Sequence, residues 1–136
     1  MSWRQSLIRI SHHEVETLQK RLAEIVERRS QAEVKLALLE AEAEAEAKAV
    51  GTSAEASRDL ADYMRGVKVR RSVLQAALAA IAAEEAGARD ALGQAFESLK
   101  KFEQVAEMAR LADERAAAQR ETKALDEMGA RAVRSR

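Results

Sequence analysis

The chain has 136 residues, in which 23 lysine and arginine residues balance 23 aspartate and glutamate residues. Aromatic residues make up only 3% of the chain, and proline and cysteine are absent. So little bulky side-chain volume excludes a thick globular core, and the lack of cysteine excludes disulfides and thiolate chemistry. Balanced charge provides no overall field to attract nucleic acid or an anionic membrane. The abundance of alanine, glutamate, arginine, lysine and leucine is typical of long helices or coiled coils.

The N-terminal segment MSWRQSLIRI has no uninterrupted apolar run as long as a signal peptide or a membrane-spanning helix needs. We therefore expect a soluble, cytoplasmic protein without direct membrane insertion. Ser2 followed by Gln5 is typical of a capping box, which begins a helix because each side chain pairs with the backbone amide of the other residue.

A heptad repeat predicts that residues 3–50 form one helix. Mostly apolar residues recur there at alternating steps of three and four, without interruption. This periodicity keeps one seam directed at a partner helix, as in coiled coils. The a positions are Ile8, Val15, Leu22, Arg29, Leu36, Ala43 and Val50, and the d positions are Ser11, Leu18, Ile25, Ala32, Leu39 and Glu46.

The stretch KAVGTSAEA, residues 48–56, separates this repeat from the next one. Gly51 suits the left-handed position that follows the last turn of many helices. Thr52 and Glu55 have the spacing of a second capping box, which predicts that a new helix begins directly afterwards. We therefore expect a turn at residues 51–53.

A second heptad repeat predicts a helix over residues 54–132. It runs without interruption from Leu60 to Phe102. Its a positions are Met64, Arg71, Leu78, Glu85, Leu92 and Leu99, and its d positions are Leu60, Val67, Leu74, Ile81, Ala88, Ala95 and Phe102.

Two seams joined by a short turn predict an antiparallel hairpin, because each seam needs a partner. If the chain reverses near Gly51, facing residues have numbers that add up to about 103. This register, the pairing of residues across the hairpin, places Arg29 opposite Leu74 and Arg71 opposite Ala32, and both guanidinium groups would reach outward along their stems. The predicted fold class is all-α: two long helices forming an antiparallel coiled-coil hairpin with a C-terminal helical overhang.

The overhang is expected to comprise residues 103–136, because pairing with the first helix ends near Phe102 in this register. A single helix of that length would extend about 50 Å. A helix that is polar nearly all round is marginal alone and gains stability from a partner, so this segment is the first place to look for function. Its sparse apolar stripe consists of Val105, Met108, Leu111, Ala118, Leu125 and Met128.

Residues that carry catalysis or bind metal do not converge in this sequence. The adjacent His12 and His13 lie about 100° apart on a helix and cannot ligate one ion together. Glutamates alternate with alanine over residues 40–46, which spreads their carboxylates around the helix. The basic residues within 65–71 have no aromatic stacking partner apart from Tyr63. We therefore expect a protein that is not an enzyme, with no cofactor, no metal site and no nucleic-acid partner.

Two segments carry a family resemblance: residues 21–33, RLAEIVERRSQAE, and residues 123–134, KALDEMGARAVR. They resemble the N-terminal helix and the C-terminal signature of the FliJ family of flagellar type III export proteins, which has YscO-type relatives in virulence secretion. The signature has an acidic pair before a hydrophobic residue, a small residue and arginines. Gly129 stands where alanine is more usual in the family.

The resemblance implies a non-enzymatic central-stalk component and chaperone-escort factor of the export apparatus, held at the cytoplasmic side of the inner membrane. In that family the terminal end of the coiled coil enters the hexameric, FliI-like export ATPase, which has a FliH-like regulator. The hairpin side contacts the FlhA-like export gate, and export chaperones are further partners. The signature residues implied for the ATPase side are Leu125, Asp126, Glu127, Met128, Arg131 and Arg134.

On the gate side, the region that corresponds to the family's contact surface contains Tyr63, Met64, Val67 and Arg70. Met64 and Val67 also occupy seam positions, so packing inside the hairpin suits their side chains better than contact with a partner, whereas Tyr63 and Arg70 occupy g positions that are better placed outward. Three alternatives to this function stay open: a structural coiled coil that associates with itself, a YscO-type virulence component, and a nucleic-acid-associated factor using residues 65–71.

Overall fold

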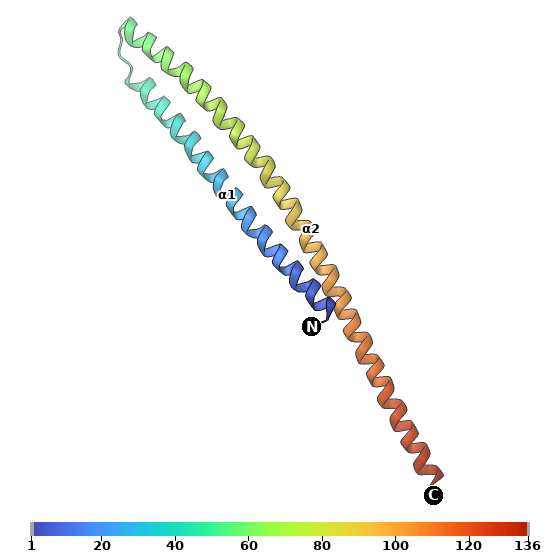
Figure 1. The fold of residues 1–136 in the computed structure, drawn as a ribbon. Helices are drawn as coiled ribbons and strands as arrows, with labels where there is room; N and C mark the ends of the chain where they lie inside the picture. The colour runs from blue at the N-terminus through green and yellow to red at the C-terminus, as the bar shows by residue number, and fades with distance from the viewer. Residues whose placement is uncertain (1, 136) are drawn as a thin grey trace. The chain divides into compact units, whose positions relative to one another are not determined.

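Two helices make up nearly all of residues 2–135, which are the residues that the computed structural model describes. Helix α1 spans Trp3–Ala49, 47 residues, and helix α2 spans Ala54–Arg134, 81 residues. These described residues contain no strand. The prediction of an all-α hairpin built from two long helices is confirmed (Figure 1).

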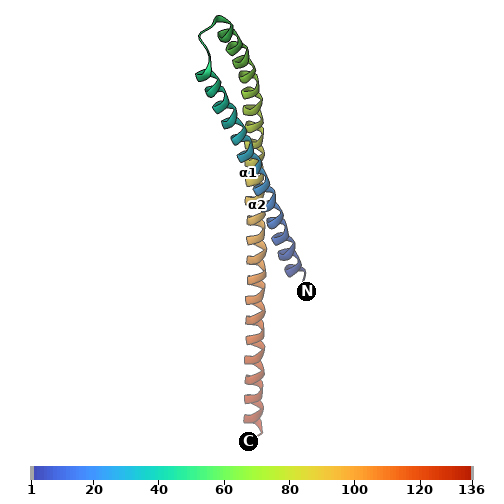
Figure 2. The same ribbon diagram turned by 90° about the vertical axis from the view of Figure 1, so that its left-hand side faces the viewer.

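The chain divides into two packed units. In the first, Glu16–Gly93, the larger part of α1 runs antiparallel beside the first half of α2 (Figures 1 and 2). The second contains the N-terminal residues through Val15 together with the chain from Gln94 onward. In each unit a segment of α1 packs against a segment of α2, so the seam is formed in both.

The seam follows the predicted heptads closely. Every a and d position from Ile8 to Ala43, and every one from Leu60 to Phe102, is buried or half-buried. Val67 is 1% exposed and Ile25 is 2% exposed. Burying a side chain of this size stabilises the fold by about 1.5–3 kcal/mol, so the narrow seam holds the helices together.

Ion pairs across the hairpin show that the predicted register was wrong by one heptad. Arg29 Nη1 lies 2.5 Å from Glu85 Oε2. In the predicted register Arg29 faces Leu74, which precedes Glu85 by eleven residues, or about 16 Å of helix. No arginine side chain spans that distance, so facing residues have numbers that add up to about 110.

Two other pairs agree with this register. Arg28 Nη1 lies 3.1 Å from Glu84 Oε2, and Arg71 Nη2 donates a hydrogen bond of 3.0 Å to Glu40 Oε2. This bond with Arg71 lowers the pKa of the Glu40 carboxyl. Arg71 therefore does not simply reach outward from the seam, as expected, but has a specific partner on α1.

Glu85 is a charged residue at an a position of the seam, with a side chain only 9% exposed. Besides the contact with Arg29, its other oxygen accepts a hydrogen bond of 3.2 Å from Arg89 Nη2. A carboxylate removed from water is tolerated only when it is paired and hydrogen-bonded. The two guanidinium groups meet that requirement, and α1 supplies the one from Arg29.

The register also determines where pairing stops at each end of the hairpin. Glu46 and Val50 are exposed, and the first turns of α2 extend past the last turn of α1 (Figures 1 and 2). Toward the other end, Ala106 and Ala109 are still half-buried. All described side chains from Arg110 to Ser135 are exposed, so the unpaired overhang begins seven residues later than expected.

The beginnings of the two helices differ in how well the sequence predicted them. The capping box at Ser2 is confirmed: the Ser2 amide donates to Gln5 Oε1 at 3.2 Å, and the Gln5 amide donates to Ser2 Oγ at 3.3 Å. At α2, however, the amide of Ala56 donates to Ser53 Oγ at 3.0 Å, so Ser53 rather than Thr52 is the cap. None of the glycines in the described chain has a positive φ, so the left-handed conformation expected at Gly51 was wrong.

The cap predicts a specific difference between two neighbouring hydroxyl residues. Ser53→Ala should destabilise the hairpin by about 1 kcal/mol, because it leaves the Ala56 amide without its acceptor. Thr52→Ala is the matched control and should change the stability by less than half as much. Thermal denaturation followed by circular dichroism at 222 nm measures both, and equal effects would contradict the assignment of the cap.

Candidate partner-binding surfaces

The exposed tail, residues 110–135, is the C-terminal part of α2 and is helical through Arg134. Large apolar side chains on it face solvent: Leu125 is 67% exposed, Met128 is 65% exposed and Val133 is 73% exposed. Leu111, Ala118 and Leu125 recur every seven residues and therefore share one side of the helix. The tail thus presents an apolar stripe that the described chain does not cover.

All six residues implied for the ATPase side lie in the last three turns of this tail and are exposed. Leu125 and Met128 are three residues apart and so share one side of the helix. Glu127, Arg131 and Arg134, at steps of four and three, share another. The remaining one, Asp126, lies about 100° around the helix from Leu125. The tail therefore combines an apolar contact with a charged side suited to a polar partner.

A cluster of charges stabilises the helix where the exposed tail begins. Arg110 bonds to both carboxylate oxygens of Glu107, at 3.0 and 2.6 Å, and also pairs with Glu114. The hydrogen bonds from Arg110 lower the pKa of the Glu107 carboxyl. Pairs three and four residues apart support helices that lack tertiary packing, which is the situation of α2 beyond this point.

The four residues implied for the gate side divide into two groups. Val67 is a core residue that packs with Leu39 and Ala43, and Met64 and Tyr63 pack against that cluster. Val67, at 1% exposure, is inaccessible to a partner. Arg70 is exposed, and its guanidinium carbon lies 5.9 Å from the centre of the Tyr63 ring. This cation–π contact holds the exposed Arg70 guanidinium over the ring of Tyr63, which is itself half-buried against the core cluster.

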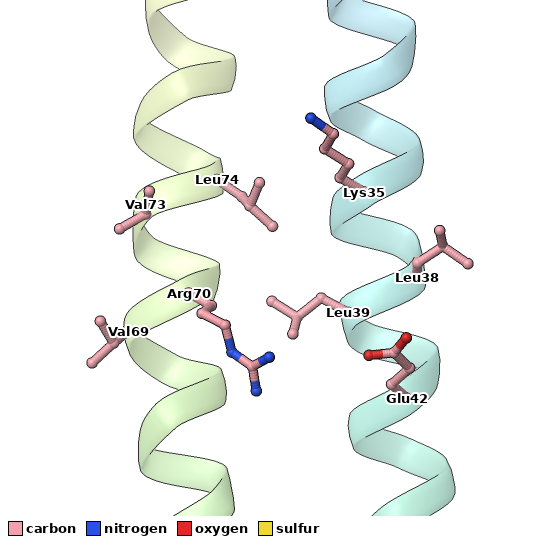
Figure 3. Close-up of a pocket in the computed structure, with 8 residues that line it drawn as sticks. All are labelled: Lys35, Leu38, Leu39, Glu42, Val69, Arg70, Val73 and Leu74. Carbon is pink, nitrogen blue, oxygen red and sulfur yellow. The ribbon is translucent and has the colours of Figure 1, made fainter.

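An apolar groove of about 420 Å³ lies beside Arg70. Leu39 and Leu74 point into the space between the helices, with Leu38 on the outer side of α1 and Val69 and Val73 on the outer side of α2 (Figure 3). Leu38 is 57% exposed, and Val69 and Val73 are each 64% exposed. The residues that line the groove are Lys35, Leu38, Leu39, Glu42, Val69, Arg70, Val73 and Leu74.

This groove was not predicted from the sequence. Its exposed apolar residues, Leu38, Val69 and Val73, occupy c and f positions of the heptads, which point away from the seam. Three large apolar residues at outward positions in one stretch of the hairpin are the signal that could have revealed it.

The described residues were also compared with the requirements of a metal site and of a membrane-spanning helix. The described residues contain no group of three or more histidines, cysteines, aspartates or glutamates placed to hold a metal ion. His12 Nε2 lies 3.7 Å from Glu103 Oε1, across the helix pair rather than beside a second ligand. None of the helices described here is both long and apolar enough to cross a membrane.

The fold and its exposed surfaces define a class of protein: a helical hairpin that presents a groove on its paired part and a stretch of unpaired helix at its C-terminus. The family model described as "Flagellar FliJ protein" matches residues 5–136. The chain is also 50% identical over 109 residues to flagellar FliJ proteins of Caulobacter vibrioides strains NA1000 / CB15N and ATCC 19089 / CIP 103742 / CB 15, matches that cover 80% of this chain and 78% of each relative. No solved structure matches the chain significantly. The chain belongs to the flagellar FliJ family.

The charge cluster at Glu107 predicts a pH dependence of tail helicity. Because the pKa of Glu107 is lowered in the helix, its contribution to stability is present above the ordinary value of 4.5 and is lost as the pH falls through the lowered value. Carbon-13 α chemical shifts of residues 107–114 should therefore report constant helicity down to about pH 4.5 and a loss below it.

Glu107→Gln provides the control for this titration. The variant should be less helical near Arg110 at neutral pH, because it lacks the charged acceptor, and should lose less helicity on acidification. Identical titration curves for the two chains would show that Glu107 does not stabilise the start of the tail.

Proposed function

We propose that this chain is a non-enzymatic central-stalk component and chaperone-escort factor of the flagellar type III export apparatus. In this role it links the FliI-like export ATPase to the FlhA-like export gate. Membership of the flagellar FliJ family supports the setting. The observation that carries the role is the helical tail, whose described side chains from Arg110 to Ser135 are all exposed.

The tail is the ATPase-side surface in this proposal. A component that enters a ring of subunits has to be narrow and has to offer side chains in all directions, and a single helix does both. Leu125 and Met128 supply apolar contact area, and Arg131 and Arg134 supply charges for carboxylates of the ring. The exposed apolar side chains of Leu125 and Met128 give the partner a favourable surface to bury, which also stabilises a helix that is marginal by itself.

The gate-side surface combines Tyr63 and Arg70 with the apolar groove beside them. A partner side chain that fills the groove would contact Leu38, Val69 and Val73, while Tyr63 and Arg70 provide an aromatic and a charged contact at its edge. Aromatic residues and arginine are the side chains that most often dominate binding energy in protein interfaces. Met64 and Val67 support this surface from inside the hairpin.

The remaining partners and the location rest on the family resemblance. The FliH-like regulator would meet the chain through the ATPase, and export chaperones would bind the chain directly. The protein would work in the cytoplasm, associated with the inner membrane only through the apparatus, with no nucleic acid and no cofactor involved.

Paired alanine variants separate the two surfaces. Leu125→Ala/Met128→Ala should weaken binding to the purified export ATPase by roughly tenfold or more and leave binding to the cytoplasmic domain of the gate unchanged. Tyr63→Ala/Val69→Ala should have the opposite effect. Biolayer interferometry with the full-length chain measures all four combinations.

Leu111→Ala is the matched control for the tail, because it removes an apolar side chain from the same side of α2 outside the family signature. It should change ATPase binding by less than about twofold. The proposed orientation would be refuted if Leu125→Ala/Met128→Ala lost gate binding and Tyr63→Ala/Val69→Ala lost ATPase binding. If both double variants bound both partners normally, the role itself would be refuted.

A further inference from the structure

The apolar seam of the hairpin is compatible with two registers that differ by one heptad. In the observed register the seam places Leu78 opposite Ala32. If α2 moves by seven residues relative to α1, Leu78 meets Ile25, and most of the other layers also exchange one apolar pair for another. The free energy of hydrophobic burial depends on the apolar area and not on which layer supplies it. This free energy is therefore similar in the two registers.

Two of the charged pairs beside the seam repeat with the same period. Glu84 pairs with Arg28, and Arg21 stands one heptad earlier in the same groove of about 530 Å³. Arg71 pairs with Glu40, and Glu33 stands one heptad earlier. Each of these α2 residues would therefore find a partner of the right charge after a shift of seven residues.

Glu85 is the exception. Its partner on α1 is Arg29, and the residue one heptad before Arg29 is Leu22. In the shifted register Arg89 on the same helix would stay bonded to one carboxylate oxygen, but the oxygen that now pairs with Arg29 would lie in the seam against apolar residues, which is costly for a side chain that is 9% exposed. Arg29 would at the same time face Leu74 and lose this acceptor.

The connection between the helices accommodates both registers. Residues 50–53 are exposed and not helical. In the observed register they span an offset of about 10 Å along the axes and about 9 Å across them, within the roughly 17 Å that five consecutive Cα–Cα steps reach. In the shifted register the helix ends are level, so the connection has slack.

We propose that the hairpin is a two-register device in which the pair Arg29–Glu85 holds the observed register. Weakening this pair would give access to a second register one heptad away. In that register Ala106 and Ala109 would leave the seam, so the unpaired part of α2 would begin seven residues earlier. This inference concerns the hairpin alone and does not depend on the proposed function.

Disulfide trapping tests the proposal directly, because the chain has no native cysteine. Ala32→Cys/Leu78→Cys reports the observed register and Ile25→Cys/Leu78→Cys reports the shifted one. Leu18→Cys/Leu78→Cys fits neither and gives the background. A disulfide forms only when the two Cα atoms approach within about 7 Å, and a heptad is about 10 Å long, so the three pairs are resolved.

Each cysteine pair is placed in three backgrounds: the unchanged chain, Arg29→Leu/Glu85→Leu, and Arg28→Gln/Glu84→Gln. In the unchanged chain only the pair for the observed register should close above background. Replacing Arg29 and Glu85 by leucine should raise closure of the shifted-register pair by about tenfold or more. Replacing Arg28 and Glu84 should not, because Glu84 has a partner in either register.

Oxidised and reduced chains are separated by gel mobility at low protein concentration, and circular dichroism checks that each variant is helical. If the leucine variant does not fold, Glu85→Gln replaces it, since the amide keeps the size of the side chain and removes its charge. If the shifted-register pair closes no more than background in a variant that lacks the Arg29–Glu85 ion pair and is helical, the second register does not exist and the proposal is refuted. If the shifted-register pair closes above background to the same extent in the unchanged chain and in the leucine variant, Arg29 and Glu85 do not hold the observed register.

Discussion

The buried carboxylate of Glu85 is the interaction on which the geometry of this hairpin depends. A heptad seam of small and branched apolar residues drives two helices together but gives similar energies at shifts of seven residues. A charged group in the same seam does not tolerate such shifts, because it requires a partner of opposite charge at one level. Arg29 provides that partner, so this pair favours one of the registers that the apolar layers alone would allow.

The register in turn decides what each end of the hairpin exposes. It leaves the first turns of α2 without a partner helix and extends pairing at the other end as far as Ala109. A shorter pairing would have added Ala106 and Ala109 to the exposed tail. The boundary between the paired and the unpaired helix, and with it the length of helix available to a partner, thus follows from the register of the two helices.

The sequence predicted the helices, the seam and the first cap, because each follows from local periodicity or from residues three apart, as at Ser2 and Gln5. It could not predict the register, since a repeat of seven matches itself after every shift of seven residues. Gly51 also suggested a tighter turn than the structure has. The tail side chains that the structure describes are exposed, because they lie beyond Ala109, the last half-buried residue of α2. Val67 was a candidate contact yet is core, and the groove beside Arg70 was missed because outward heptad positions resemble ordinary surface.

The two candidate surfaces differ in what binding requires of them. The groove lies on the paired part of the hairpin, so its residues are already ordered and a partner loses little entropy in fixing them. The tail lacks tertiary packing, so a partner that binds it also stabilises its helix. Since α2 carries both the groove side chains Val69 and Val73 and the entire tail, any coupling between the surfaces has to pass along this helix or through its seam with α1. The seam is the place where such coupling can be strong, because packed side chains favour discrete arrangements over continuous deformation.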